Sequence, residues 1–201
     1  MVFSRSRSYA FPPEFRIGNS EILNVKKTLR ILRVLIQDDL KFGAQVKDMV
    51  RRANVTTWVL RRMKSLGVDQ DTLVTYWKAE GRVHLELASP VWSSSLTIAQ
   101  SQDLERAQRM AMAAIAGRWE PSHSRQLLEL GLERLEPRRL RLGKVWALRT
   151  AQDSRHTDLF TPTGARPRPG KHVQMYRTPW TRTVAHYNSA VPYLTRLLNG
   201  F

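Results

Sequence analysis

The sequence contains no cysteine. This absence excludes disulfides, thiolate metal sites, zinc knuckles and thiol catalysis, and it suits a reducing intracellular compartment. Long apolar runs are lacking as well, because none approaches the roughly 20 residues that a membrane-spanning helix needs. We therefore expect an intracellular protein of the nucleus or cytoplasm that is not secreted and does not bind a membrane.

Acidic residues are scarce. Only 17 Asp and Glu stand against 33 Lys and Arg, which gives a formal net charge of +16. Such a charge repels itself in the folded state unless an anion lies nearby. Nucleic acid is the commonest anionic partner, and an anionic membrane or a highly acidic protein is the alternative. The hydrophobic fraction of 42% argues against global disorder, and 201 residues suffice for one domain, with or without a tail.

The first residues, MVFSRSRSYAF, are basic and rich in serine. A mitochondrial presequence has this composition, so it is one interpretation of the N-terminus. Pro12 and Pro13 follow directly and would interrupt the amphipathic helix that a presequence forms. We therefore favour a start that belongs to the folded protein.

Composition divides the chain into three regions. Residues 1–42 have the apolar runs and turn signals of short strands, and residues 43–150 have the periodicity of helices. Residues 151–201 are basic and rich in proline, which indicates an extended tail. The expected fold class is mainly α: an antiparallel helical bundle with a small β portion at the N-terminus, as in an α+β fragment.

Capping residues predict where the helices begin and end. Gly67 and Gly117 are typical residues after a helix, Asp69 is a good N-cap, and Thr97 with Gln100 matches the capping box. Helices are therefore expected at residues 44–66, 69–88, 97–117, 122–130 and 137–150.

The first expected helix has two different faces when its residues are placed about 100° apart. The face expected to pack carries Val46, Met49, Val50, Ala53, Thr57, Leu60 and Met63. Within an arc of roughly 100° on the other side lie the candidate nucleic-acid-binding residues Lys47, Arg51, Trp58, Arg61 and Arg62. A basic stripe suits phosphates, and a tryptophan within it could stack on a base. The alternatives are a solvated helix surface and a Trp58 packed under the tail.

The one local hint of catalysis is Asp38-Asp39, which follows an apolar stretch. Paired aspartates can hold two divalent metals, but such a site needs a third carboxylate from another strand. The favoured interpretation is a surface turn in which one aspartate caps the next segment of the chain. Five scattered histidines suggest no metal site, so we predict no catalytic residue, no metal and no cofactor.

Several short motifs occur in an order and spacing typical of one family. They are TLRILRVLIQDDLKFGAQV at residues 28–46, LVTYW at 73–77, LELASPVW at 85–92, SLT at 95–97, LERAQRMAM at 104–112, IAG at 115–117 and LGLERLEPRRLRL at 130–142. With them the chain resembles the C-terminal part of non-LTR (LINE-type, jockey-like) retrotransposon reverse transcriptases. MVFSRSR at residues 1–7 is similar to the strand that closes the palm in that family, and the resemblance extends into the tail.

The resemblance implies a chain that covers the end of the palm (1–42), a thumb-like or connection-like helical domain (43–150) and a basic tail (151–201). The strands that carry the family's catalytic aspartates, which bind Mg²⁺, would precede residue 1. The chain departs from the family at Arg33, where a turn glycine is usual, and at Leu87, where tyrosine is usual. An arginine at a glycine turn would strain or remodel it.

The expected function is that of an RNA-directed DNA polymerase segment that holds a primer–template duplex and is not active alone. The palm and fingers could be supplied in trans by another chain, with an interface on an apolar helix face. The alternatives are a stand-alone basic RNA-binding or structural protein, and a truncated element without function. The last would expose the apolar surface of residues 1–36 and aggregate.

Overall fold

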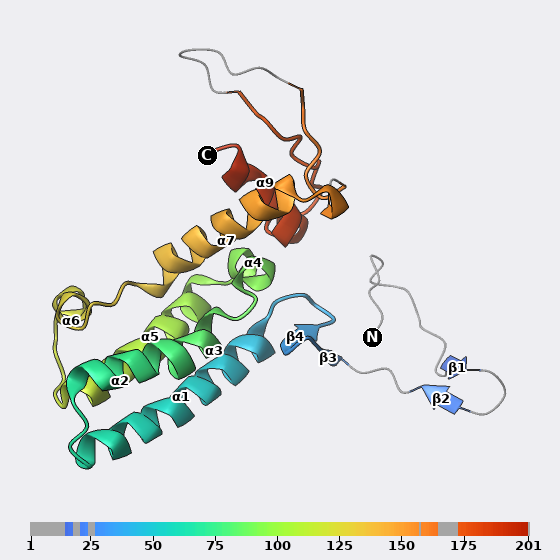
Figure 1. Ribbon diagram of the computed structural model, residues 1–201. Helices are drawn as coiled ribbons and strands as arrows, with labels where there is room; N and C mark the ends of the chain where they lie inside the picture. Colours follow the sequence, from blue (N-terminus) through green and yellow to red (C-terminus); the bar gives the residue numbers. More distant parts are fainter. Residues whose placement is uncertain (1–14, 18–20, 24–26, 157, 165–172, 201) are drawn as a thin grey trace.

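A computed structural model describes residues 15–17, 21–23, 27–156, 158–164 and 173–200 (Figure 1). The strand expected at residues 1–7 and the alternative presequence therefore lie outside the described residues. The described chain is mainly helical, with short antiparallel strand pairs near its start. The first pair is β1 (Phe15–Ile17) with β2 (Glu21–Leu23), and the second is β3 (Thr28–Ile31) with β4 (Val34–Gln37).

The helices follow in the order of the expected segments. They are α1 (Gly43–Ser65), α2 (Gln70–Tyr76), the π-helical turn η1 (Trp77–Gly81), α3 (Arg82–Glu86), α4 (Ser89–Trp92), the 3₁₀ turn η2 (Ser93–Ser95), α5 (Ile98–Ala116), α6 (His123–Glu129), α7 (Leu135–Gln152), the 3₁₀ turn η3 (Ser154–His156), α8 (Val184–Tyr187) and α9 (Ala190–Leu198). Within the described residues, no helix combines the length and the apolar character that crossing a bilayer requires.

The predicted capping residues determine several boundaries. Thr97 and Gln100 form the full capping box at the start of α5, with each side chain accepting a hydrogen bond from the other residue's backbone N–H. The Asp69 carboxylate accepts from the Thr72 N–H at 2.9 Å, which caps α2. Gly117 ends α5 with a φ of 73°, a left-handed conformation that glycine adopts without a steric penalty. These local predictions are confirmed.

The single helix expected at residues 69–88 is wrong in one respect, because a π-helical turn interrupts it. The Trp77 ring is fully buried and lies against Gly81, where a Cβ atom would stand 2.0 Å from the ring carbon Cε3. Only glycine fits under this ring. The π turn of η1 thus brings a large indole into the core, and the helical stretch then ends at Glu86.

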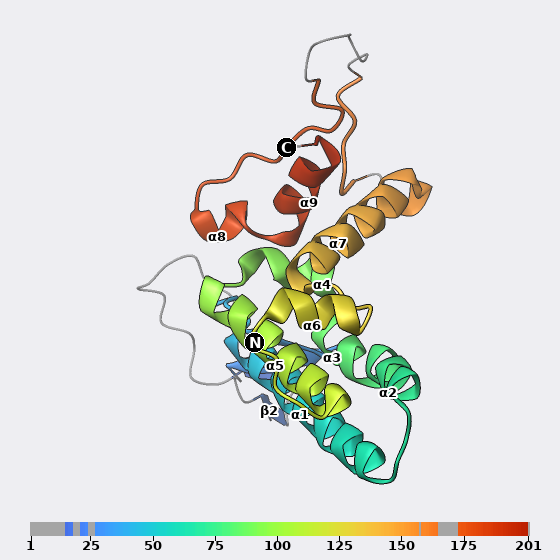
Figure 2. The ribbon, with the colours of Figure 1, turned by 90° about the vertical axis from the view of Figure 1, so that its left-hand side faces the viewer.

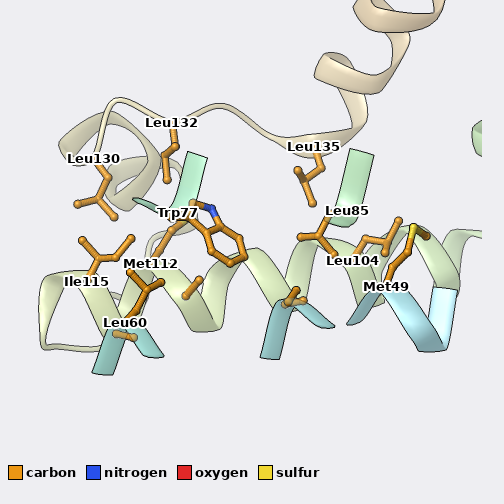
Figure 3. Packing of buried hydrophobic residues seen from close by; sticks show 14 of the residues in the cluster. Met49, Leu60, Trp77, Leu85, Leu104, Met112, Ile115, Leu130, Leu132 and Leu135 are labelled. Carbon is orange, nitrogen blue, oxygen red and sulfur yellow. The ribbon is translucent and has the colours of Figure 1, made fainter. Parts of the chain in front are cut away.

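The main core lies between α1, α5 and the elements that cover them. Its fully buried members include Leu60 of α1, Trp77 of η1, and Leu104 and Met112 of α5. Figure 3 shows that Leu130 and Leu132, after α6, and Leu135, in α7, point toward this layer of helices. The side chain of Trp92 is also buried, and its indole N–H donates to the carbonyl of Leu87 at 2.8 Å. The core therefore fixes α1 with one face inward and the other outward.

A second, smaller core corrects the expectation that residues 151–201 form an extended tail. Helix α9 packs on α7, and both views of the molecule show the two side by side (Figures 1 and 2). The core consists of Ala147, Phe160, Leu194 and Leu197. The Asn199 side chain, directly after α9, connects this helix to residue 176: it accepts a hydrogen bond from the Tyr176 N–H and donates one to the Tyr176 carbonyl. Residues 190–198 form a short amphipathic helix, which the proline-rich composition around it conceals.

Candidate nucleic-acid interface

Helix α1 positions the predicted basic stripe on the outside of the protein. Lys47, Arg51, Trp58, Arg61 and Arg62 are all exposed, while the opposite face packs into the main core. Five of the residues predicted to pack are buried, and Val50 and Met63 are partly buried against the same cluster. The prediction of a two-faced helix is confirmed. Trp58 is 66% exposed, so the alternative that it packs under the tail is wrong.

Among the described residues, most cations of the stripe form no ion pair with an acidic side chain. Asp48 is the only acidic residue of α1. Its carboxylate accepts from Arg51 Nη2 and Arg52 Nε, each at 2.9 Å. Partial burial raises the pKa of Asp48, but these two hydrogen bonds outweigh it and hold the pKa below its ordinary value. Within the described part of the chain, Lys47, Arg61 and Arg62 form no ion pair.

A groove between α1 and α5 runs beside the stripe. It encloses about 730 Å³ and is lined by Lys47, Arg51 and Arg61 from α1 and by Arg106 and Met110 from α5. Arg106 is partly neutralised, because its Nη1 lies 2.7 Å from Asp103 Oδ1. Trp58 and Arg62 do not line this groove, and they extend the same basic face farther round the helix. The structure thus brings three of the five predicted residues to one groove.

A second hollow, of about 620 Å³, continues from this groove across α5. Arg106 and Met110 line both, and the second also has Arg109, Trp119 and Arg134 in its wall. The Arg109 guanidinium stands 4.4 Å from the centroid of the Trp119 ring, and Trp119 is itself 55% exposed. An exposed aromatic beside cations is typical of surfaces that hold single-stranded nucleic acid. The sequence analysis did not predict this second hollow. The one signal for it in the sequence is Trp119, which follows the helix-ending Gly117 by two residues.

The two aspartates considered for catalysis lie in the turn between β4 and α1. Both are exposed. The Asp39 carboxylate accepts from the Lys41 N–H at 3.0 Å, and the Asp38 N–H donates to the Lys27 carbonyl at 3.0 Å. This is the geometry of a surface turn. Across the described ranges, no group of three His, Asp or Glu side chains is arranged to hold a metal ion.

Arg138 and Arg139, the paired arginines of the LGLERLEPRRLRL motif, have different environments. Arg138 contacts Glu86 through its Nε and lies 2.9 Å from Glu133 through its Nη1. Burial lowers the pKa of Arg138, but the bonds to these two carboxylates outweigh it and raise the pKa above its ordinary value. Arg138 therefore joins α7 to the end of α3. Arg139 points into the protein.

No family model, no curated protein and no solved structure matches the chain.

Proposed function

We propose that this chain is the thumb-like, C-terminal segment of an RNA-directed DNA polymerase of the non-LTR retrotransposon type, and that it grips a primer–template duplex. The observation that carries the proposal is the outward face of α1, where Lys47, Arg61 and Arg62, which form no ion pair among the described residues, are exposed on the same helix as the exposed Trp58. Phosphate contacts of this kind position a duplex without reading its sequence. The order of the sequence motifs supplies the family.

Several finer features belong to the same proposal. Residues 43–150 would act as an antiparallel bundle that presents α1 to the nucleic acid, and residues 1–42 would form the end of the palm, whose remaining portion another chain could supply. In this role the chain holds the duplex while the palm performs the chemistry, so it has no polymerase activity by itself. The location we propose is the nucleus or cytoplasm, where RNA and DNA are both present.

A charge-matched pair of variants tests whether α1 makes the contacts. Lys47→Gln with Arg62→Gln removes two exposed cations of the stripe, neither of which supports Asp48. Each lost phosphate contact reduces the slope of log K against log salt by about 0.9, so we expect a slope shallower by about 2. Fluorescence anisotropy with a labelled RNA–DNA duplex measures this.

The matched control is Lys144→Gln with Arg149→Gln, which removes the same charge from exposed positions on α7. It should leave the slope unchanged. If both double variants weaken binding equally, net charge rather than the α1 face holds the duplex, and the proposed site is wrong.

A further inference from the structure

Arg139 of α7 is buried, and within the described part of the chain it forms no ion pair with a carboxylate. Its side chain is 3% exposed. Arg139 Nη2 donates to the Ser101 hydroxyl at 2.9 Å, and its Nε donates to the Ser93 hydroxyl at 3.4 Å. Its Nη1 has no hydrogen-bond partner among the described residues. Because a buried charge is normally paired, this arginine is an exception that calls for an anion.

A pocket of about 500 Å³ lies beside this guanidinium. Its polar lining consists of Ser93, Thr97, Ser101, Arg134, Glu136, Arg139 and Tyr193. Thr97 caps the N-terminus of α5, a helix of 19 residues with no acidic residue in its first turn. The positive end of the helix dipole therefore adds to the two guanidinium groups. Hydroxyls, cations and a helix N-terminus together form a setting for an anion with several acceptor oxygens.

We propose that this pocket binds a phosphoryl group, as a phosphomonoester or as inorganic phosphate. Arg139 and Arg134, which both line the pocket, supply the positive charge that holds the phosphate oxygens. The Ser93 and Ser101 hydroxyl oxygens accept from Arg139, so their protons are free to donate to the ligand. A forked guanidinium and a tetrahedral dianion fit in both charge and geometry.

The pocket adjoins the candidate nucleic-acid interface. Ser101 and Arg134 also line the hollow that contains Trp119, which in turn shares Arg106 with the groove beside α1. A strand held along this surface could therefore place a terminal phosphate at Arg139. That source of the phosphate rests on the proposed function, whereas the site itself does not.

Glu136 provides a test in which a substitution should strengthen phosphate binding instead of weakening it. It also lines the pocket, and it is exposed. Its carboxylate repels a phosphate dianion, so Glu136→Gln should tighten phosphate binding severalfold. Because the side chain is exposed, this change leaves the fold intact.

The experiment is a titration of the full chain with inorganic phosphate, followed through the side-chain Nε–H signal of Arg139 in ¹⁵N NMR spectra. We expect a saturable shift that sodium chloride at the same ionic strength does not produce. Arg139→Gln lacks this signal, so its affinity is measured by isothermal titration calorimetry; binding should weaken by about tenfold or more, since the variant removes one of the two cations of the pocket. Arg149→Gln, an exposed arginine on the same helix, should leave the affinity unchanged.

The same signal identifies the source of the phosphate. A 5′-phosphorylated RNA that shifts Arg139 more than its 5′-hydroxyl counterpart assigns the site to a strand end. An equal response to the two RNAs, with the phosphate shift retained, assigns it to a free phosphate ion.

The proposal is overturned if chloride reproduces the phosphate shift, or if Glu136→Gln leaves the affinity unchanged. The second result is decisive even if Arg139→Gln does not fold. These outcomes are separate from those of the proposed function, because Lys47→Gln with Arg62→Gln should make the salt slope of duplex binding shallower and leave the Arg139 shift in place.

Discussion

At the scale of single residues, the β3–β4 hairpin contains an unusual turn. Leu32 and Arg33 connect the two strands, and both have left-handed backbones, with φ values of 46° and 71°. A two-residue hairpin turn of this kind is normally made by Asn-Gly or Gly-Gly, because a Cβ atom clashes in this conformation. Non-LTR reverse transcriptases, which the sequence resembles, usually have glycine at the position of Arg33. The backbone strain that the sequence predicts for this turn therefore occurs at Arg33.

Replacing that arginine should stabilise the protein. Arg33→Gly removes the steric penalty of the left-handed conformation, although glycine makes the unfolded chain more flexible. We expect the free energy of unfolding to rise by about 0.5–1 kcal/mol in urea denaturation. Arg30→Gly, in the neighbouring strand β3, is the control and should lower it. A lower stability for Arg33→Gly would mean that the side chain contributes more than the turn costs.

At the scale of elements, the buried face of α1 should determine stability, and its exposed face is the one that we propose to bind nucleic acid. Leu60 is fully buried, whereas the Trp58 side chain is 66% exposed. Leu60→Ala should lower the free energy of unfolding by about 2–5 kcal/mol. Trp58→Ala should change it by about 0.5 kcal/mol or less.

Trp58 should matter for binding of nucleic acid although it matters little for stability. Trp58→Ala should weaken binding of an RNA–DNA duplex, because a stacking or shielding contact is lost, while its urea unfolding curve stays that of the wild type. Unaltered duplex affinity would remove Trp58 from the interface and leave the four basic residues of the stripe to account for binding.

Elements specified by neighbouring residues were predictable from the sequence, and elements specified by distant contacts were not. The start of α5 depends on Thr97 and Gln100, which are three residues apart, and the sequence shows both. The π turn depends on the Trp77 ring, which lies over Gly81 and is buried in the main core against residues that are distant in the sequence. Helix α9 depends on Leu194 reaching Ala147 and Phe160 across the second core. Periodicity carries no information about such contacts, so the sequence suggested a continuous helix and an extended tail.

The same distinction applies to the site. The α1 stripe could be read from one helix, because its residues share a face. The hollow with Trp119 and the pocket at Arg139 each combine side chains from several elements. Only the folded chain brings these together.

At the scale of the whole molecule, two partly buried histidines link stability to pH. Burial lowers the pKa of His84 below its ordinary value of 6.5, and nearby Arg52 lowers it further. Burial likewise lowers the pKa of His123, with Glu105 opposing the shift and Arg109 adding to it. Below about pH 6.5 the unfolded chain therefore binds protons that the folded chain does not bind.

Stability should consequently fall as the pH falls from about 7 through 6.5, and level off below the folded-state pKa values. Urea denaturation at a series of pH values measures this, and His84→Gln with His123→Gln should flatten the curve. The carboxylates act in another range. Asp48 and Glu133 have lowered pKa values, so their contribution is lost only below their ordinary values of 3.8 and 4.5. A curve that is flat between neutral pH and about pH 5 would contradict the histidine account.

We propose that the net charge of +16 gives the whole molecule an affinity for polyanions, and that the arrangement of that charge decides whether the affinity is specific. If charge alone mattered, any polyanion would bind equally well. The proposed interface on α1 and α5 would instead favour one geometry of the phosphate backbone.

The most direct measurement is the affinity of the chain for a labelled RNA–DNA primer–template duplex, beside single strands and heparin, over a series of salt concentrations. The account predicts a preference for the duplex and a steep log–log slope, with about 0.9 for each phosphate neutralised. Equal binding to all three polyanions, or aggregation without saturable binding, would contradict a thumb-type grip.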